Sequence, residues 1–106
     1  MDRTLPIYKQ ELEKLLKDWG CKKLSSQQLK LWMECNYLPL HIDIAPNEPS
    51  YIQSAIHYIM NEFELSNPNY YRPDNYKIAI DFLNCNEQDS EQKRADFIHK
   101  CFKFLE

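Results

Sequence analysis

The amino-acid sequence predicts an all-α fold, a compact bundle of four to five helices formed by residues 1–106 as a single helical domain. Hairpin sheets favour valine, threonine and glycine-bearing turns, whereas this chain has no valine, one threonine and one glycine. Several segments instead carry apolar residues at helical spacing. The hydrophobic fraction of 43% is enough to build one core without metal or disulfide support.

The first helix is predicted from about Leu5 to Trp19, with Thr4 as its N-cap and Pro6 in its first turn. Gly20 follows at the place where a left-handed residue commonly ends a helix. Apolar side chains recur at helical spacing and define the buried face that we expect. They are Leu5, Tyr8, Leu12, Leu15, Leu16 and Trp19.

The second helix has the clearest start signal in the chain. Ser25 and Gln28 have the spacing of a capping box, and Leu24 and Leu29 have the spacing of a hydrophobic staple. The residues that follow are apolar around much of the helix, which predicts burial on several sides. They are Leu29, Leu31, Trp32, Met33 and Cys35.

A third helix is predicted over residues 48–64, started by Asn47 or by Ser50 with Gln53. Its core stripe consists of Ile52, Ala55, Ile56, Ile59 and Phe63. This regular spacing makes it the most clearly amphipathic segment of the chain.

The last helix is predicted to begin at Asp89 or Ser90 and to continue to about Leu105. One apolar stripe runs along it, widened by neighbouring aromatic residues and a cysteine. The stripe is Ala95, Ile98, Phe102 and Leu105, and the widening residues are Phe97, Cys101 and Phe104.

Residues 74–83 fit two structures. Asp74 can cap a helix that continues through Leu83, and this is the preferred prediction. The same residues also alternate as a strand over 77–82, and such a strand could pair with residues 40–44. The alternative is therefore an α+β fold with a small two-stranded sheet.

The four cysteines are expected to be free thiols in a cytoplasmic protein that does not associate with membranes. No apolar secretory segment follows Met1, and no stretch is apolar enough to span a bilayer. Cys35 and Cys101 fall within helical apolar patterns and are expected to be buried. Cys85 lies between two asparagines and is expected to be the most accessible thiol.

The sequence contains no pattern that predicts catalysis or a cofactor. Its single glycine excludes a Gly-rich phosphate loop, and no pair of cysteines or histidines has the local spacing of a zinc site. The pairs His41–Asp43 and Asp96–His99 have no further group that would suggest proton transfer. We therefore expect no enzyme and no catalytic, cofactor-binding or metal-binding residues; a small enzyme without a recognisable motif is the alternative.

Charge is distributed unevenly along the chain. Residues 31–71 contain five acidic residues and no Lys or Arg, while the whole chain has a net charge of −3. If these acids share one face, Glu48, Glu62 and Glu64 are candidate contact residues. Such a face would suit an inhibitor or immunity-type protein that covers a basic site on its target. Acids scattered around the fold are the alternative.

A nucleic-acid partner is not favoured. The isoelectric point near 5.6 opposes a strong electrostatic footprint. A local phosphate contact would require the lysines near the first two helices to converge on one face. These are Lys14, Lys17, Lys22, Lys23 and Lys30.

The loop at residues 67–72 is the segment most suited to recognition. Tyr70, Tyr71 and Arg72 belong to residue types that are enriched at interface hot spots. Residues 67–70, Asn-Pro-Asn-Tyr, also resemble the NPxY tetrapeptide read by phosphotyrosine-binding domains, although an Asn–Pro turn with tyrosines packed on the domain is favoured. The sequence therefore predicts a non-catalytic protein–protein interaction module, an adaptor or regulatory binding protein, and leaves homo-oligomerisation open.

Overall fold

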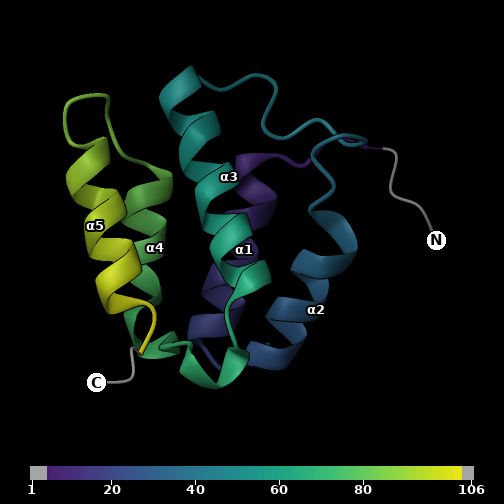
Figure 1. The fold of residues 1–106 in the computed structure, drawn as a ribbon, viewed down its shortest axis with the longest axis vertical. Helices are drawn as coiled ribbons and strands as arrows, with labels where there is room; N and C mark the ends of the chain where they lie inside the picture. Colours follow the sequence, from purple (N-terminus) through teal and green to yellow (C-terminus); the bar gives the residue numbers. More distant parts are fainter. Residues whose placement is uncertain (1–4, 104–106) are drawn as a thin grey trace.

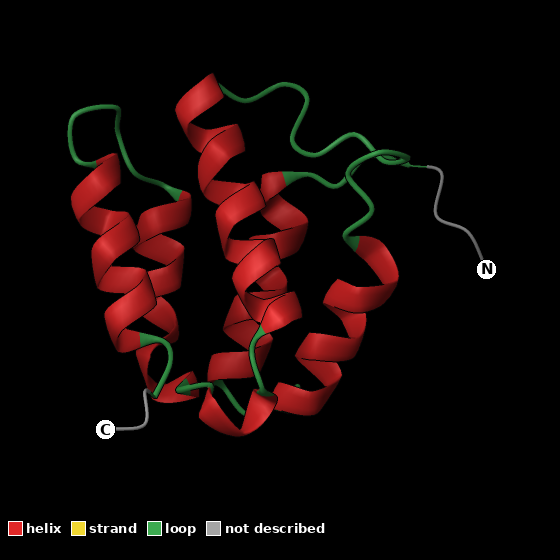
Figure 2. Cartoon of the chain, in the orientation of Figure 1, coloured by secondary structure: helices red, strands yellow, loops and turns green. Residues whose placement is uncertain are grey.

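The computed structural model describes residues 5–103, and this part of the chain contains five α-helices (Figure 1). Successive helices run in opposite directions, so α1, α3 and α5 point one way and α2 and α4 the other. Two short 3-10 helices, η1 and η2, connect α3 to α4. The elements are α1 (Lys9–Gly20), α2 (Ser26–Asn36), α3 (Ser50–Leu65), η1 (Pro68–Tyr70), η2 (Pro73–Asn75), α4 (Tyr76–Leu83) and α5 (Ser90–Lys100). The described residues form no strand (Figure 2), and the predicted all-α bundle is confirmed.

The first helix begins later than predicted, because the residues before it pair with a distant segment. Ile7 forms a parallel bridge with Ile44, flanked by backbone hydrogen bonds of 3.0 and 2.7 Å. The bridge buries Ile7 completely, whereas Leu5 is 72% and Tyr8 45% exposed. Residues 5–8 are therefore not the first turn of a helix, and two residues of the predicted stripe lie outside the core.

Gly20 has a different role from the one predicted. It is the last residue of α1 and does not have a positive φ; the left-handed residue is Lys22, with φ 65°. A Cβ added to Gly20 would overlap the ring of Tyr76 at the start of α4. The missing side chain thus allows α1 and α4 to pack closely. The N-cap predicted for this helix, Thr4, lies outside the described residues.

α2 begins with the predicted capping box. The Ser25 hydroxyl accepts a hydrogen bond from the Gln28 amide at 3.0 Å, and the Gln28 side chain accepts one from the Ser25 amide at 2.8 Å. The predicted burial on several sides is wrong, because Leu31 is 60% exposed and Cys35 is exposed too. α2 lies at the edge of the bundle and packs mainly on α3, so only one of its faces is covered (Figure 1).

α3 has the predicted core stripe but not the predicted cap. Pro49 occupies the N-cap position, where no side chain caps the helix, so neither Asn47 nor Ser50 has that role. The Pro49 carbonyl instead accepts hydrogen bonds from the amides of Ile52 and Gln53 at 3.0 and 2.9 Å. The buried residues of α3 are Ile52, Ala55, Ile56, Ile59, Met60 and Phe63.

Residues 77–82 lie within α4, so the helical prediction is confirmed and the alternative sheet is wrong. The predicted cap is also wrong, because Asp74 lies within η2 and Asn75 occupies the N-cap position without a side-chain cap. The buried residues Ala79, Phe82 and Leu83 have the i, i+3, i+4 spacing of one helical face. In a strand, Ala79 and Phe82 would have pointed to opposite sides. Residues 40–42 form a turn and a bend, and the pairing of this segment is the single bridge of Ile44 already described.

α5 ends at Lys100, several residues earlier than predicted, because the chain then turns and pairs with the segment between α3 and α4. Phe102 forms an antiparallel bridge with Tyr71, with backbone hydrogen bonds of 2.8 and 2.6 Å on either side. Phe102 is buried by this pairing rather than by a helix. The other residues predicted near this end, Phe104 and Leu105, lie outside the described residues.

Replacing Gly20 by alanine is expected to destabilise the fold, although the same change usually stabilises a helix by about 1 kcal/mol. The added methyl group would overlap the Tyr76 ring, and accommodating it should cost about 1–3 kcal/mol. Urea unfolding followed by circular dichroism measures the change. In a Tyr76→Ala background, which removes the ring, Gly20→Ala should be neutral or stabilising. A single Gly20→Ala variant that is more stable than the wild type would contradict this packing.

Candidate functional site

The loop predicted to be a recognition site contributes its central tyrosine to the core. Tyr71 is 6% exposed, its ring packs edge-on against Phe63, and its hydroxyl donates a hydrogen bond to the Phe63 carbonyl. Burial, with a smaller contribution from Glu34, raises the pKa of Tyr71 above its ordinary value of 10. Tyr70 is half-buried and Arg72 is exposed. Of the three loop residues, these two remain accessible to a partner.

Residues 67–70 form the Asn–Pro turn that the sequence favours. The Asn67 side chain accepts a hydrogen bond from the Asn69 amide at 2.9 Å, and the Tyr70 amide donates to the Asn67 carbonyl, also at 2.9 Å. The resulting 3-10 helix η1 packs beside α2. The tetrapeptide that resembles NPxY is thus a folded connection within the domain.

The three candidate acidic residues do not form one compact cluster. Glu48 precedes α3 and lies 3.9 Å from the Lys9 ammonium, whereas Glu62 and Glu64 lie in the last turn of α3. α3 has 16 residues, which corresponds to a length of about 24 Å. Burial raises the pKa of the half-buried Glu62 carboxyl. The helix therefore separates one paired acid from the other two.

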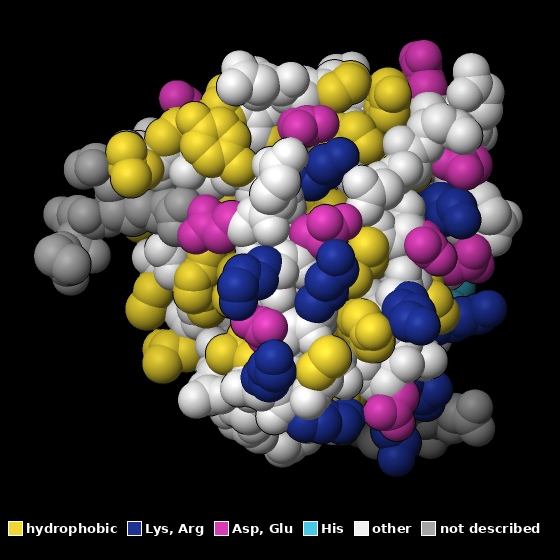
Figure 3. All heavy atoms as spheres, turned by 180° about the vertical axis from the view of Figure 1, so that it is seen from behind, with side chains coloured by type: hydrophobic (Ala, Val, Ile, Leu, Met, Phe, Trp, Pro, Cys, Tyr) yellow, Lys and Arg dark blue, Asp and Glu magenta, His cyan; other side chains and the backbone are white. Residues whose placement is uncertain are grey.

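Four of the five lysines near the first two helices have oxygen atoms nearby. Three of them form ion pairs: Lys14 with Asp18 at 2.8 Å, Lys17 with Glu13 at 3.8 Å and Lys22 with Asp74 at 3.2 Å. Lys30 donates to the backbone carbonyls of Glu64 and Ser66. Figure 3 shows basic and acidic side chains interspersed over the face seen from behind. This arrangement gives little support to a phosphate-binding surface.

All four cysteines are free thiols, but their exposure differs from the prediction. Cys35 is exposed because α2 lies at the edge, and Cys85 is buried because it packs on the core directly after α4. Cys101 is buried as predicted. Burial raises the pKa of the Cys85 thiol and raises that of Cys101 to about 12. A reactive thiolate is therefore disfavoured at both buried cysteines.

Residues 5–103 were compared with the requirements of a metal site and of a membrane-spanning helix. This part of the chain contains no group of three or more His, Cys, Asp or Glu side chains that could hold a metal ion. Within the same range, no helix has both the length and the apolar character needed to cross a bilayer. Of the His–carboxylate pairs considered above, His41 and Asp43 are exposed, and Asp96 accepts a hydrogen bond from Gln92 at 3.0 Å.

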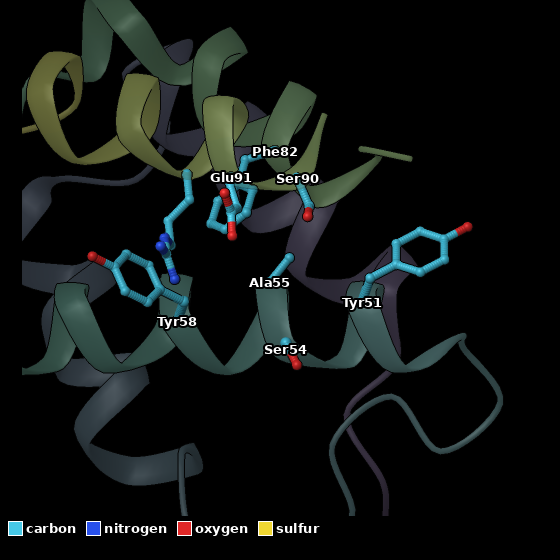
Figure 4. A pocket seen from close by; sticks show the side chains of 8 residues that line it. Tyr51, Ser54, Ala55, Tyr58, Phe82, Ser90 and Glu91 are labelled. Carbon is cyan, nitrogen blue, oxygen red and sulfur yellow. The ribbon is translucent and has the colours of Figure 1, made fainter. Parts of the chain in front are cut away.

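A hollow of about 350 Å³, which we call the α3–α5 groove, lies between these two helices (Figure 4). Eight residues line it: Tyr51, Ser54, Ala55, Tyr58, Phe82, Ser90, Glu91 and Arg94. α3 contributes aromatic and small side chains, α4 contributes one phenylalanine, and the first half of α5 contributes the two charged groups. In Figure 4 the Glu91 carboxylate points from α5 toward α3.

Helical spacing on α3 brings two tyrosines to the groove. Tyr51, Ser54 and Tyr58 occupy positions i, i+3 and i+7 and therefore share one face. The Tyr58 ring makes edge-on contacts with Phe82 and Phe97, at centroid distances of 6.0 and 6.3 Å. The core thus holds the Tyr58 ring in place at the wall of the groove.

Arg94 lies over this ring. Its guanidinium carbon is 5.5 Å from the centroid of Tyr58, within the range of a cation–π interaction. Neither Arg94 nor Glu91 forms a salt bridge with another residue of the described part of the chain. The groove therefore contains a positioned cation without a carboxylate partner in residues 5–103.

A second, more open hollow of about 380 Å³ shares Ser54 and Tyr58 with the α3–α5 groove. Here the Tyr37 hydroxyl lies 3.0 Å from His57 Nδ1. Burial lowers the pKa of His57, and burial together with the Glu64 charge raises the pKa of Tyr37. Both groups are therefore neutral near pH 7, and the Tyr37 hydroxyl is not activated as a nucleophile.

The residues at the groove were not among the sequence-based candidates. Tyr51 and Tyr58 stand beside the core stripe of α3, seven positions apart, and this spacing was the available signal. No sequence pattern pointed to Arg94, because the Tyr58 ring that it contacts lies on another helix.

Comparison of the chain with models of known protein families, with curated proteins and with solved structures finds no match. The candidate site therefore rests on the geometry of this chain.

Tyr71→Phe is expected to lower the free energy of unfolding by about 1–2 kcal/mol, because the buried Phe63 carbonyl loses its donor. The matched change Tyr70→Phe, at a half-buried position, should cost less than about 0.5 kcal/mol. Chemical unfolding of both variants measures the difference. Equal effects would contradict the assignment of Tyr71 to the core.

His57 should make the protein less stable as the pH falls. Burial holds the native pKa of His57 below its ordinary value of 6.5, so the unfolded chain binds the proton more tightly. The stabilising contribution is complete above the unfolded pKa and is lost as the pH falls through the native pKa.

An NMR titration of the His57 ring should give a pKa below 6.5. His57→Gln should reduce the loss of stability measured by urea unfolding between about pH 7 and pH 5. A native pKa at or above 6.5 would show that this explanation is wrong.

Proposed function

We propose that this chain is a non-catalytic protein-binding module, an adaptor or regulatory protein, whose contact surface is the α3–α5 groove. The observation that carries the proposal is that Tyr51, Tyr58 and Arg94 all line one open hollow of about 350 Å³. Tyrosine and arginine are enriched at interface hot spots. The volume is within the range of clefts that bind ligands.

The chemistry of the groove supports binding rather than catalysis. Its two aliphatic hydroxyls belong to Ser54 and Ser90, and the Ser90 hydroxyl donates to the Glu87 carbonyl at 3.3 Å. Nucleophilic catalysis needs a base hydrogen-bonded to the nucleophile, and no histidine lines the groove. Binding of a partner, in contrast, requires only the aromatic walls and the charged groups that are present.

The position of the acidic residues favours the groove over the inhibitor-type contact predicted from sequence. Glu48 is separated from Glu62 and Glu64 by the length of α3, so these three residues would not cover one compact basic site together. Tyr70 and Arg72 remain the alternative contact, because both are at least partly accessible.

Changing Tyr51 and Arg94 together to alanine should reduce capture of the main partner from extracts of the native cell by more than about tenfold. The reason is the loss of the aromatic wall and the cation of the groove. Quantitative mass spectrometry of the captured proteins measures the effect, and thermal unfolding verifies that the variant is folded.

Tyr8→Ala is the matched control, because Tyr8 is 45% exposed and is not part of the groove. It should leave capture unchanged. A double alanine variant at Tyr70 and Arg72 tests the loop. Loss of the partner in the loop variant, with normal capture by the groove variant, would contradict the proposal.

A further inference from the structure

We infer that the α3–α5 groove binds a segment of a partner protein that carries a large apolar side chain and, within a few residues, an Asp or Glu whose carboxylate pairs with Arg94. This inference rests on the proposed function and defines the chemistry of the occupant.

Arg94 is one of several described cations without an ion pair, and it is the one that lies over an aromatic ring at the groove. Lys9, Lys14, Lys17 and Lys22 each lie 2.8–3.9 Å from a carboxylate, whereas Arg94 has no such partner among residues 5–103. Its guanidinium is nevertheless held 5.5 Å from the Tyr58 centroid. A group that is already positioned loses less conformational freedom on binding, and a guanidinium can donate two hydrogen bonds to one carboxylate.

Glu91 lines the same groove and would favour a basic occupant if its charge were uncompensated. It lies in the first turn of α5, where the free amides and the helix dipole stabilise a carboxylate. Arg94 lies beyond that turn, where this field falls off. The helix terminus thus stabilises the Glu91 carboxylate in part, whereas Arg94 has no such support, and this difference favours a carboxylate on the occupant.

The rest of the groove selects an apolar group next to that carboxylate. Tyr51, Ala55 and Phe82 line the groove, and Phe82 is otherwise part of the core, with only 2% of its surface exposed. An apolar side chain placed here would extend the core packing and remove apolar surface from water. The second hollow, which shares Ser54 and Tyr58, provides a polar continuation for the remainder of the segment.

Selection of random peptides displayed on phage against the whole chain tests this inference. We expect the enriched sequences to combine a large apolar residue with a nearby Asp or Glu. A synthetic peptide from the selection should bind about tenfold more weakly when its acidic residue is replaced by the corresponding amide. Fluorescence anisotropy at low salt measures the two affinities.

The role of Arg94 is tested with the same pair of peptides. In Arg94→Gln, the acidic peptide and its amide analogue should bind equally. In Lys100→Gln, which removes a positive charge from the same helix but outside the groove, the roughly tenfold preference should persist. Arg94 is exposed, and an unchanged melting temperature would confirm that its variant is folded.

The outcomes separate this inference from the proposed function. Selected peptides whose binding is lost in Tyr51→Ala but does not depend on an acidic residue would overturn the carboxylate inference and leave the groove as a binding site. The same conclusion would follow if the selected peptides were rich in Lys and Arg. If Tyr51→Ala leaves peptide binding unchanged, or if the selection enriches no sequence, both the carboxylate inference and the proposed function of the groove are overturned.

Discussion

The rest of the structure depends on the contacts that the ring of Phe63 makes with four other aromatic rings. Phe63 is fully buried near the end of α3. Four other rings surround it at the following centroid distances: Tyr71 at 5.0 Å, Phe102 at 5.2 Å, Trp19 at 5.3 Å and Phe97 at 5.6 Å. These rings belong to the α3–α4 connection, the segment after α5, α1 and α5. One side chain thus joins parts of the chain that are distant in sequence, and large aromatic surfaces make such contacts strongly stabilising.

The same aromatic contacts explain where the groove forms. Phe97 and Phe102 hold the later part of α5 and the residues after it against Phe63. Between the first halves of α3 and α5, by contrast, several of the lining residues are small, namely Ser54, Ala55 and Ser90. Close packing requires side chains large enough to fill the space between two helices. Where they are small, a hollow remains, and aromatic and charged side chains stand around it.

The aromatic residues of the chain therefore have two roles: some complete the core and others line the groove. Tyr71, which resembles a recognition residue by its position in a polar loop, completes the aromatic core. Tyr51 and Tyr58, on an otherwise regular helix, reach the groove. Sequence position in a loop or a helix does not decide between these uses, because exposure depends on which other elements cover a residue. This is why the groove was not predicted, although the helix that carries its tyrosines was.

The sequence by itself determined those features whose physical cause lies within a few residues along the chain. The capping box of Ser25 and Gln28 joins groups three residues apart, and the core stripe of α3 follows from helical geometry alone. Tertiary structure decided those features that depend on residues distant from them in the sequence. The late start of α1 depends on Ile44, the early end of α5 on Tyr71, and the role of Gly20 on the ring of Tyr76. Hydrogen bonds and steric contacts between such distant residues override local propensity once the aromatic core has brought them together.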